Sequence, residues 1–268
     1  MKIYISADIE GIAGICDWKE TEKGDDYEYF RTLMTKEVKA CCDALIEKGI
    51  TDITVRDAHD SARNILIDML PKEVKLIRGW SNGLCEMMDG LDETYDAAIF
   101  IGYHSPARSE NNPLSHTLNL RHNHIKINNK IVSEYHLNTY YAQTKGVPVI
   151  MVSGDEGLTN IVKSENELTS TVATKTGYHG AIISMHPEIV CSNIAKKTAE
   201  AISNLEKYGK KAFFISLPHQ LSTEIHYRNH KDAYRATFYP GAARVSSDKT
   251  IFNSNDIIET LKFIMFCD

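Results

Sequence analysis

The chain has 268 residues, of which 43% are hydrophobic and 25% are charged, and it contains 15 Gly and 7 Pro. This composition is typical of a folded globular protein and excludes a largely disordered chain. The formal net charge of -6 is spread along the sequence and would repel a phosphate backbone, so we expect no nucleic-acid partner.

The first residues lack the long apolar stretch of a signal peptide or a membrane span, because the short run 3–7 is followed at once by acidic residues. None of the six Cys belongs to a CxxC pair, so we interpret them as buried thiols of a reducing compartment. We therefore expect a cytoplasmic protein that makes no membrane contact.

Strands and helices are predicted to alternate over the first part of the chain. Residues 2–7 are β-branched and apolar and predict a buried strand. Apolar residues at intervals of three and four then predict a helix over 30–45, with Asp25 or Asp26 as its cap and Gly49 just past its end. Further strands are expected near 53–55, 97–101 and 147–152.

A second set of elements follows. Asn128 and Asn129 tolerate positive φ and predict a tight hairpin, which leads into a helix over about 134–145. Pro187 suits the first position of a long helix that ends at Gly209. Beyond it we expect short antiparallel strands at 224–226 and 236–239 and a final helix from about Asp256.

These elements predict an α/β fold with a mostly parallel open sheet, helices on both faces, and a smaller C-terminal α+β unit. We expect residues 1–210 to form the catalytic domain that binds metal. Residues 211–268 would form the smaller unit, which we expect to provide substrate or oligomer contacts.

Residue types that bind metals recur where the predicted strands end. Asp8 and Glu10 close the first strand at positions i and i+2, His59 follows the second strand, and His104 follows another. Ligands of open parallel sheets bind beyond the carboxyl ends of the strands, so these side chains should converge. Carboxylates with imidazoles suit zinc or another first-row divalent ion, and Glu134, at a predicted helix start, is a further ligand candidate for a second ion.

Each residue also has an ordinary structural explanation. Asp8 would simply end a strand, and Asp57 would either cap a turn or orient a metal-bound imidazole. Three strand ends with such residues are hard to explain by capping alone. In the loop after Pro113 we prefer His116 as acid, base or oxyanion stabiliser, because nothing like a nucleophile elbow surrounds Ser115. His122, His124 and His136 are best interpreted as exposed polar positions of the hairpin and helix.

The ordered motifs are more specific than any single residue. They are IYISADIEGIAG at 3–14, RDAH at 56–59, IGYH at 101–104, SHTL at 115–118, and a hairpin leading to Glu134. Over about residues 1–190 this set resembles the binuclear-zinc D-aminopeptidase family of the DppA type.

The resemblance implies a role for each of these residues. Asp8 would bridge two zinc ions per chain, Glu10 and His59 would complete one site, His104 and Glu134 would complete the other, and His116 would match the catalytic histidine. It further implies hydrolysis of short peptides with an N-terminal D-amino acid such as D-alanine, by a hydroxide that bridges the metals. A ring-shaped homo-oligomer is expected, and other first-row divalent metals remain candidates.

Two alternatives stay open. The same binuclear centre would also suit another amide or a phosphoester, although Arg56, Arg63, Arg108 and Arg121 are scattered and no Gly-rich phosphate cradle accompanies them. The second alternative is a non-catalytic assembly protein whose ions only stabilise the fold. Because His116 is an ionisable group left over once the ligands are assigned, it favours the enzyme.

Overall fold

A computed structural model describes residues 1–24 and 26–268. Its main body is a six-stranded sheet with the order β3-β2-β1-β4-β7-β8, in which every neighbouring pair runs parallel. The strands are β1 (Lys2–Ala7), β2 (Asp52–Asp57), β3 (Val74–Ile77), β4 (Ala97–Tyr103), β7 (Val149–Gly154) and β8 (Ser170–Ala173). The parallel sheet expected from the alternating strands and helices is confirmed.

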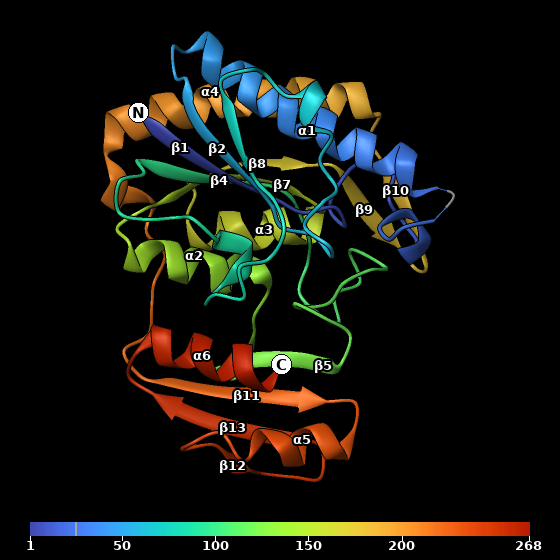
Figure 1. The fold of residues 1–268 in the computed structure, drawn as a ribbon, viewed down its shortest axis with the longest axis vertical. Helices are drawn as coiled ribbons and strands as arrows, with labels where there is room; N and C mark the ends of the chain where they lie inside the picture. The colour runs from blue at the N-terminus through green and yellow to red at the C-terminus, as the bar shows by residue number, and fades with distance from the viewer. Residues whose placement is uncertain (25) are drawn as a thin grey trace.

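Helices cover both faces of this sheet (Figure 1). On one face α1 (Tyr27–Glu47) packs against α4 (Pro187–Tyr208), and on the other lie α2 (Glu134–Thr144) and α3 (Glu156–Glu165). This three-layer arrangement confirms the predicted fold class and leaves the carboxyl ends of the strands as the edge where a site can form.

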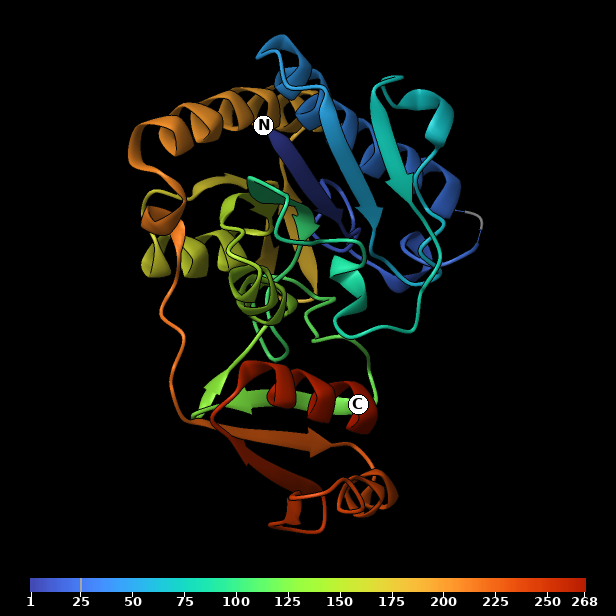
Figure 2. The ribbon, with the colours of Figure 1, turned by 60° about the vertical axis from the view of Figure 1, so that its left-hand side comes forward.

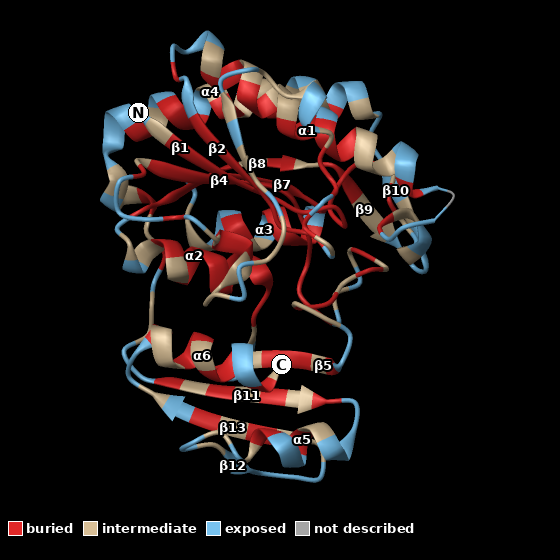
Figure 3. Ribbon diagram, viewed as in Figure 1, coloured by how far each residue is buried: buried red, intermediate tan, exposed pale blue. Residues whose placement is uncertain are grey.

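The central strands are buried on both sides, which explains their continuous apolar sequences. In β1, Ile3 and Ile5 belong to the cluster under α1 and α4, whereas Tyr4 belongs to the cluster under α2 and α3. Figure 3 shows this buried layer at the centre and the exposed residues on the outer sides of the helices. Because successive side chains of a strand point to opposite faces of the sheet, β1 contributes to the hydrophobic clusters on both faces.

A second, antiparallel sheet lies beside the main body (Figure 2). Its order is β12-β13-β11-β5-β6, so strands from residues 122–131 pair with strands from the C-terminal part of the chain. The elements are β5 (His122–Ile127), β6 (Lys130–Ile131), β11 (Leu221–Tyr227), α5 (His230–Ala236), β12 (Ala243–Arg244), β13 (Lys249–Ser254) and α6 (Ile257–Cys267). The smaller α+β unit is thus present, and the division of the chain at residue 210 stays a prediction.

Several local predictions can be compared with the structure. Asn128 and Asn129 have φ angles of 49° and 65° in the β5–β6 hairpin, and Pro187 occupies the first turn of α4, as expected. The strand predicted at 236–239 is wrong, because α5 runs to Ala236 and turns follow it. Asp25 lies outside the described residues, and the side chain of Asp26 makes no capping hydrogen bond to α1.

The remaining elements are short. β9 (Lys175–Tyr178) and β10 (Ala181–Ser184) form a hairpin, and 3-10 turns occur at Trp18–Glu20, Ile67–Met69, Glu86–Met88 and Lys210–Phe213. All six Cys are free, but Cys16, Cys85 and Cys191 are only partly buried. Among the residues that the structure describes, none of the helices has the length and apolar character needed to cross a bilayer.

Candidate metal centre

Three neighbouring strands deliver the first set of candidate ligands. Asp8 follows β1, His59 follows β2 and His104 follows β4, and β1 pairs with both of the other strands. Because the strands are parallel, their carboxyl ends meet at one edge of the sheet. The backbone N–H of Asp8 donates to the carbonyl of Ile101 at 2.8 Å, which holds the end of β1 against β4.

Asp8, Glu10 and His59 form one group of buried ligand atoms, all within 4.8 Å of one another. His59 Nδ1 lies 3.2 Å from Asp8 Oδ1 and 3.1 Å from Glu10 Oε2. The other ring nitrogen, Nε2, lies 2.9 Å from the carbonyl of Thr21 and can donate its proton there. In the neutral ring with this tautomer, the lone pair of Nδ1 faces the two carboxylates, as the lone pair of a metal-bound imidazole does.

A second group contains His104, His116 and Glu134. His104 Nδ1 lies 2.9 Å from the carbonyl of Ser105, which again leaves Nε2 free to face carboxylates. That Nε2 lies 3.3 Å from Glu134 Oε2 and 3.6 Å from Asp8 Oδ2. One oxygen of Asp8 therefore faces His59 and the other faces His104, so this carboxylate lies between the two groups.

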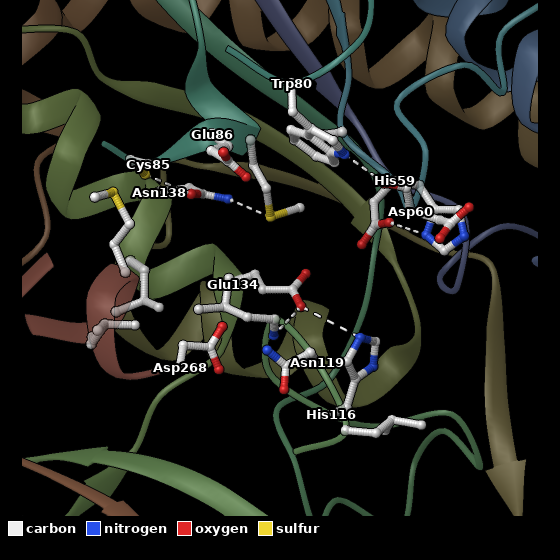
Figure 4. Close-up of a pocket in the computed structure, with 18 of the residues that line it drawn as sticks. His59, Asp60, Trp80, Cys85, Glu86, His116, Asn119, Glu134, Asn138 and Asp268 are labelled. Atoms are coloured by element: carbon white, nitrogen blue, oxygen red, sulfur yellow. Dashed lines mark hydrogen bonds and ion pairs between the residues drawn. The ribbon is translucent and has the colours of Figure 1, made fainter. Parts of the chain in front are cut away.

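His116 joins the second group from the loop between β4 and β5. Its Nδ1 lies 2.9 Å from the carbonyl of Leu114, and its Nε2 lies 3.7 Å from Glu134 Oε1 and 4.0 Å from Glu10 Oε1. Trp18 touches the ring edge-on, with centroids 5.1 Å apart. Figure 4 shows His59, Glu134 and His116 pointing into the same pocket. All six residues singled out from the sequence thus come together: five of them line the pocket, and His104 lies behind them in contact with Asp8 and Glu134.

The unsatisfied atoms of these residues fit divalent cations. Asp8 Oδ2, Glu10 Oε2 and His104 Nε2 are buried and have no hydrogen-bond partner among the described residues. Buried charges of this kind are costly unless they are paired or coordinate a metal. Three carboxylates and imidazole nitrogens are a donor set that suits zinc.

In the absence of a cation, burial and neighbouring charges shift the pKa values of these groups. Burial raises the pKa of Asp8, and the Glu10 carboxylate raises it further. For His104, burial acts to lower the pKa, but Glu134 and the other carboxylates outweigh it and raise the pKa to about 10. For Glu134, burial acts upward, yet the charge of His104 lowers the pKa to about 2. A proton on an imidazole thus balances the carboxylates where a cation would otherwise do so.

Glycines let the strand ends approach closely enough to build the site. A Cβ on Gly11 would lie 1.8 Å from the carbonyl oxygen of Tyr103. A Cβ on Gly102, where φ is +71°, would lie 2.2 Å from the carbonyl oxygen of Asp8. Any larger residue would push the ends of β1 and β4 apart, which explains glycine at both positions.

Some interpretations from the sequence need correction. Asp57 accepts hydrogen bonds from the backbone N–H groups of Asn64 and Ile65 at 2.6 and 2.7 Å, so it caps a turn, as the first alternative had it. His122, His124 and His136 are buried, not exposed, and they belong to neither ligand group. The hydroxyl of Ser115 donates to the carbonyl of Ser109 at 3.0 Å.

The sequence predicted that the ligand candidates converge, but not which individual residues form the pocket around them. The pocket has a volume of about 840 Å³ and is lined both by the metal-ligand candidates and by residues of the C-terminal helix α6. Leu261, Ile264 and Met265 of α6 supply an apolar wall, and Asn138 of α2 and Trp80 add further sides. The pattern of α6 predicts a helix but gives no signal of which residues it faces.

Comparisons with known proteins agree with this geometry. The family model described as D-aminopeptidase matches residues 1–266. The D-aminopeptidase of Bacillus subtilis (strain 168) is 31% identical over an aligned length of 271 residues, and the alignment covers 99% of this chain and 96% of that protein. A solved structure, described as the Zn-dependent D-aminopeptidase DppA from Bacillus subtilis, a self-compartmentalizing protease, has a TM-score of 0.90 at 29% identity and covers 100% of this chain and 96% of that one.

Proposed function

Because the chain belongs to the D-aminopeptidase family, a family of peptidases and hence of hydrolases, we propose that it is a zinc-dependent aminopeptidase that removes the N-terminal D-amino acid from short peptides such as D-alanyl peptides. The observation that carries the proposal is the position of Asp8, whose two oxygens face the two ligand groups inside one pocket.

Two zinc ions per chain would be held by this set. Asp8, Glu10 and His59 would hold one ion, and Asp8, His104 and Glu134 would hold the other. When bound, such a pair supplies Lewis acidity and lowers the pKa of water from 15.7 to about 7, which makes hydroxide available at neutral pH. The assignment is supported by the backbone carbonyls that hold the far nitrogens of His59 and His104.

His116 is left for proton transfer. Its Nδ1 donates to the Leu114 carbonyl, so in the neutral ring Nε2 carries the lone pair. Burial lowers the pKa of His116, which favours that neutral form. Nε2 then accepts a proton during attack, and the resulting imidazolium stabilises the oxyanion or protonates the leaving amine.

The shape and charge of the pocket suit a short peptide. Its volume of about 840 Å³ lies within the range of small-molecule sites. Carboxylates outside the ligand groups, Glu22, Asp60 and Glu86, provide negative charge for a substrate ammonium group. The apolar wall from α6 provides contact for the rest of the peptide.

The phosphoester alternative has less support. Among the described residues that line the pocket, Arg121 is the single Lys or Arg. Arg56 is fully buried and donates to the carbonyls of Glu86 and Gly79 at 3.0 and 2.6 Å, so it takes no part in the pocket. A phosphate ester would bring more negative charge to a pocket already rich in carboxylates. The non-catalytic alternative is disfavoured because the ligand groups open onto a pocket.

Assembly and location extend the proposal. The related structure is described as self-compartmentalizing, and on that basis we propose a ring-shaped homo-oligomer for this chain. The contact of α6 with the pocket supports a substrate-binding role for the unit that we place at residues 211–268. A cytoplasmic location stays a prediction.

The deciding experiment combines metal analysis with a panel of matched D- and L-dipeptides. We expect about two zinc ions per chain, release of the N-terminal residue from D-alanyl peptides, and loss of turnover on chelation. Equal or greater turnover of the L-dipeptides would overturn the stereochemical part. Turnover of phosphoesters in place of peptides would establish the alternative.

A further inference from the structure

The loop between β4 and β5 carries both His104 and His116, and Asn112 lies between them with only 1% of its surface exposed. We propose that Asn112 is a positioning residue: its side-chain amide fixes both zinc half-sites and His116 relative to one another. This inference rests on the proposed function, because it assigns a role in the same centre.

The first contact of Asn112 reaches the loop after β1. Its Nδ2 donates to the backbone carbonyl of Glu10 at 3.0 Å. Lys175 Nζ donates to the same carbonyl at 2.5 Å, so two buried donors hold this peptide group. The position of the Glu10 carboxylate, 3.1 Å from His59 Nδ1, depends on that backbone.

The second contact reaches His104. The same Nδ2 donates to Asp155 Oδ2 at 3.1 Å, and Asp155 Oδ2 also accepts the backbone N–H of Ser105 at 2.7 Å. The Ser105 hydroxyl donates to the other oxygen of Asp155, and the Ser105 carbonyl faces His104 Nδ1 at 2.9 Å. Asn112 and Asp155 thus connect residue Ser105, whose carbonyl orients His104, with the backbone carbonyl of Glu10.

The third contact reaches His116. Asn112 Oδ1 accepts the backbone N–H of Leu114 at 3.0 Å, and the carbonyl of Leu114 accepts from His116 Nδ1 at 2.9 Å. Asn112 thus holds the backbone of Leu114, and the carbonyl of this residue sets both the tautomer of His116 and the direction of its Nε2.

The amide is matched to its surroundings. Both N–H groups of Nδ2 have acceptors and Oδ1 has a donor. In Asn112→Asp the shape is retained, but a carboxylate would then face the Asp155 carboxylate and the Glu10 carbonyl, and each would lose the hydrogen bond that Asn112 donates. Since the same group serves three segments, its loss should affect zinc binding and His116 together.

The test compares wild type, Asn112→Asp and Asn112→Ala, with Asn160→Asp as the matched control because Asn160 is exposed on α3. We expect both variants at Asn112 to raise the zinc Kd, measured by chelator competition, by about tenfold or more, and to lower kcat by about 10–100-fold with little change in KM. The control should match wild type. Cobalt-substituted Asn112→Asp should show a shifted visible absorption spectrum.

A double-mutant cycle with His116→Ala separates positioning from general destabilisation. If Asn112 acts through His116, the same substitution at Asn112 lowers kcat far less in the His116→Ala background. Equal factors in both backgrounds, with an unchanged zinc Kd, would overturn the inference. Asn112→Ala allows the same comparison if Asn112→Asp does not fold. If the wild-type enzyme is active and the Asn112 variants have the same zinc Kd and kcat, only this inference is contradicted. If the wild-type protein binds no zinc, both the proposed function and this inference are contradicted.

Discussion

The imidazole of His116 lies flat against that of His104, with ring centroids 4.4 Å apart and planes 12° apart. Stacking brings Nε2 of both rings to the Glu134 carboxylate, at 3.7 and 3.3 Å. By distance alone His116 could therefore be a ligand of the second ion, and the grouping of ligand atoms includes it. We assign His116 to proton transfer because Asp8 can serve as the third ligand of the second ion beside His104 and Glu134. A ligand role and a proton-transfer role for His116 predict different results when this residue is replaced.

We predict that His116→Ala lowers kcat about a hundredfold or more and leaves two zinc ions per chain. The loss of rate is expected because no other group would take over the proton transfer, whereas Asp8, His104 and Glu134 would still hold the second ion. Turnover and zinc content, by elemental analysis, are measured on the same sample. His219→Ala, at an exposed position, is the control. A zinc content near one per chain would make His116 a ligand instead.

We predict that Asp8→Ala removes most of the bound zinc and abolishes turnover. Asp8 Oδ1 lies 3.2 Å from His59 and Oδ2 lies 3.6 Å from His104, so its loss takes a ligand from both ions. Asp52→Ala is the control, because Asp52 starts β2 with only an exposed ion pair to Lys75. If Asp8→Ala retains both ions, the bridging role is wrong.

The sequence predicted this convergence because it follows from topology. Asp8, His59 and His104 each end a strand of a parallel sheet, and the pairing of β1 with β2 and β4 brings such ends together. The prediction needed only the strands and their direction. It did not need the register or the loops.

The parts that the sequence did not predict depend on loop conformation and on tertiary contacts. Asn112 donates to the backbone carbonyl of Glu10 and accepts from the backbone N–H of Leu114, whose carbonyl contacts His116. Contacts of this kind between a side chain and the backbone leave no periodic pattern in the sequence. The wall of the pocket from α6 depends on how the second sheet sits against the first. At 236–239 the apolar residues suggested a strand, but Ala236 is the last residue of α5, which packs on β11 and β13, and turns follow it.

We predict that zinc binding releases protons and becomes tighter as pH rises from 6 to 9. Without metal, His104 has its pKa raised to about 10, so it is protonated over this range, and a ligand imidazole must be neutral. Each released proton should increase the apparent affinity about tenfold per pH unit. Calorimetric titration in two buffers with different heats of ionisation counts the protons. The His104→Ala variant should release fewer protons, and an affinity that is equal at pH 6 and 8 would contradict the prediction.

We predict that Glu37→Gln stabilises the fold increasingly as pH rises. Burial raises the pKa of Glu37 to about 8, from an ordinary value of 4.5, although the N–H of Ala13 acts in the opposite direction. Between these values the folded protein holds the proton and the unfolded chain does not, so this group lowers stability as pH increases. From pH 5.5 to 7.5 the free energy of unfolding of the variant should gain about 2 kcal/mol relative to wild type.

Urea unfolding of both proteins at the two pH values tests this prediction, because pH effects common to the two proteins cancel in the comparison. Glu47→Gln, on an exposed position of the same helix, should show no such gain. A constant difference between Glu37→Gln and wild type across the range would mean that Glu37 is ionised in the fold.

We predict that Gly11→Ala destabilises the protein by about 2 kcal/mol or more and weakens zinc binding. The added Cβ would lie 1.8 Å from the carbonyl oxygen of Tyr103. Because the atoms it meets belong to the backbone of β4, the clash can be relieved only by moving the ends of β1 and β4 apart. That movement displaces Glu10 on one side and His104 on the other. Gly180→Ala is the matched control, because nothing lies within 4 Å of its added Cβ. Thermal unfolding and zinc titration should separate the two variants, and a Gly11→Ala protein with wild-type zinc affinity would mean that the ligands do not depend on this close approach.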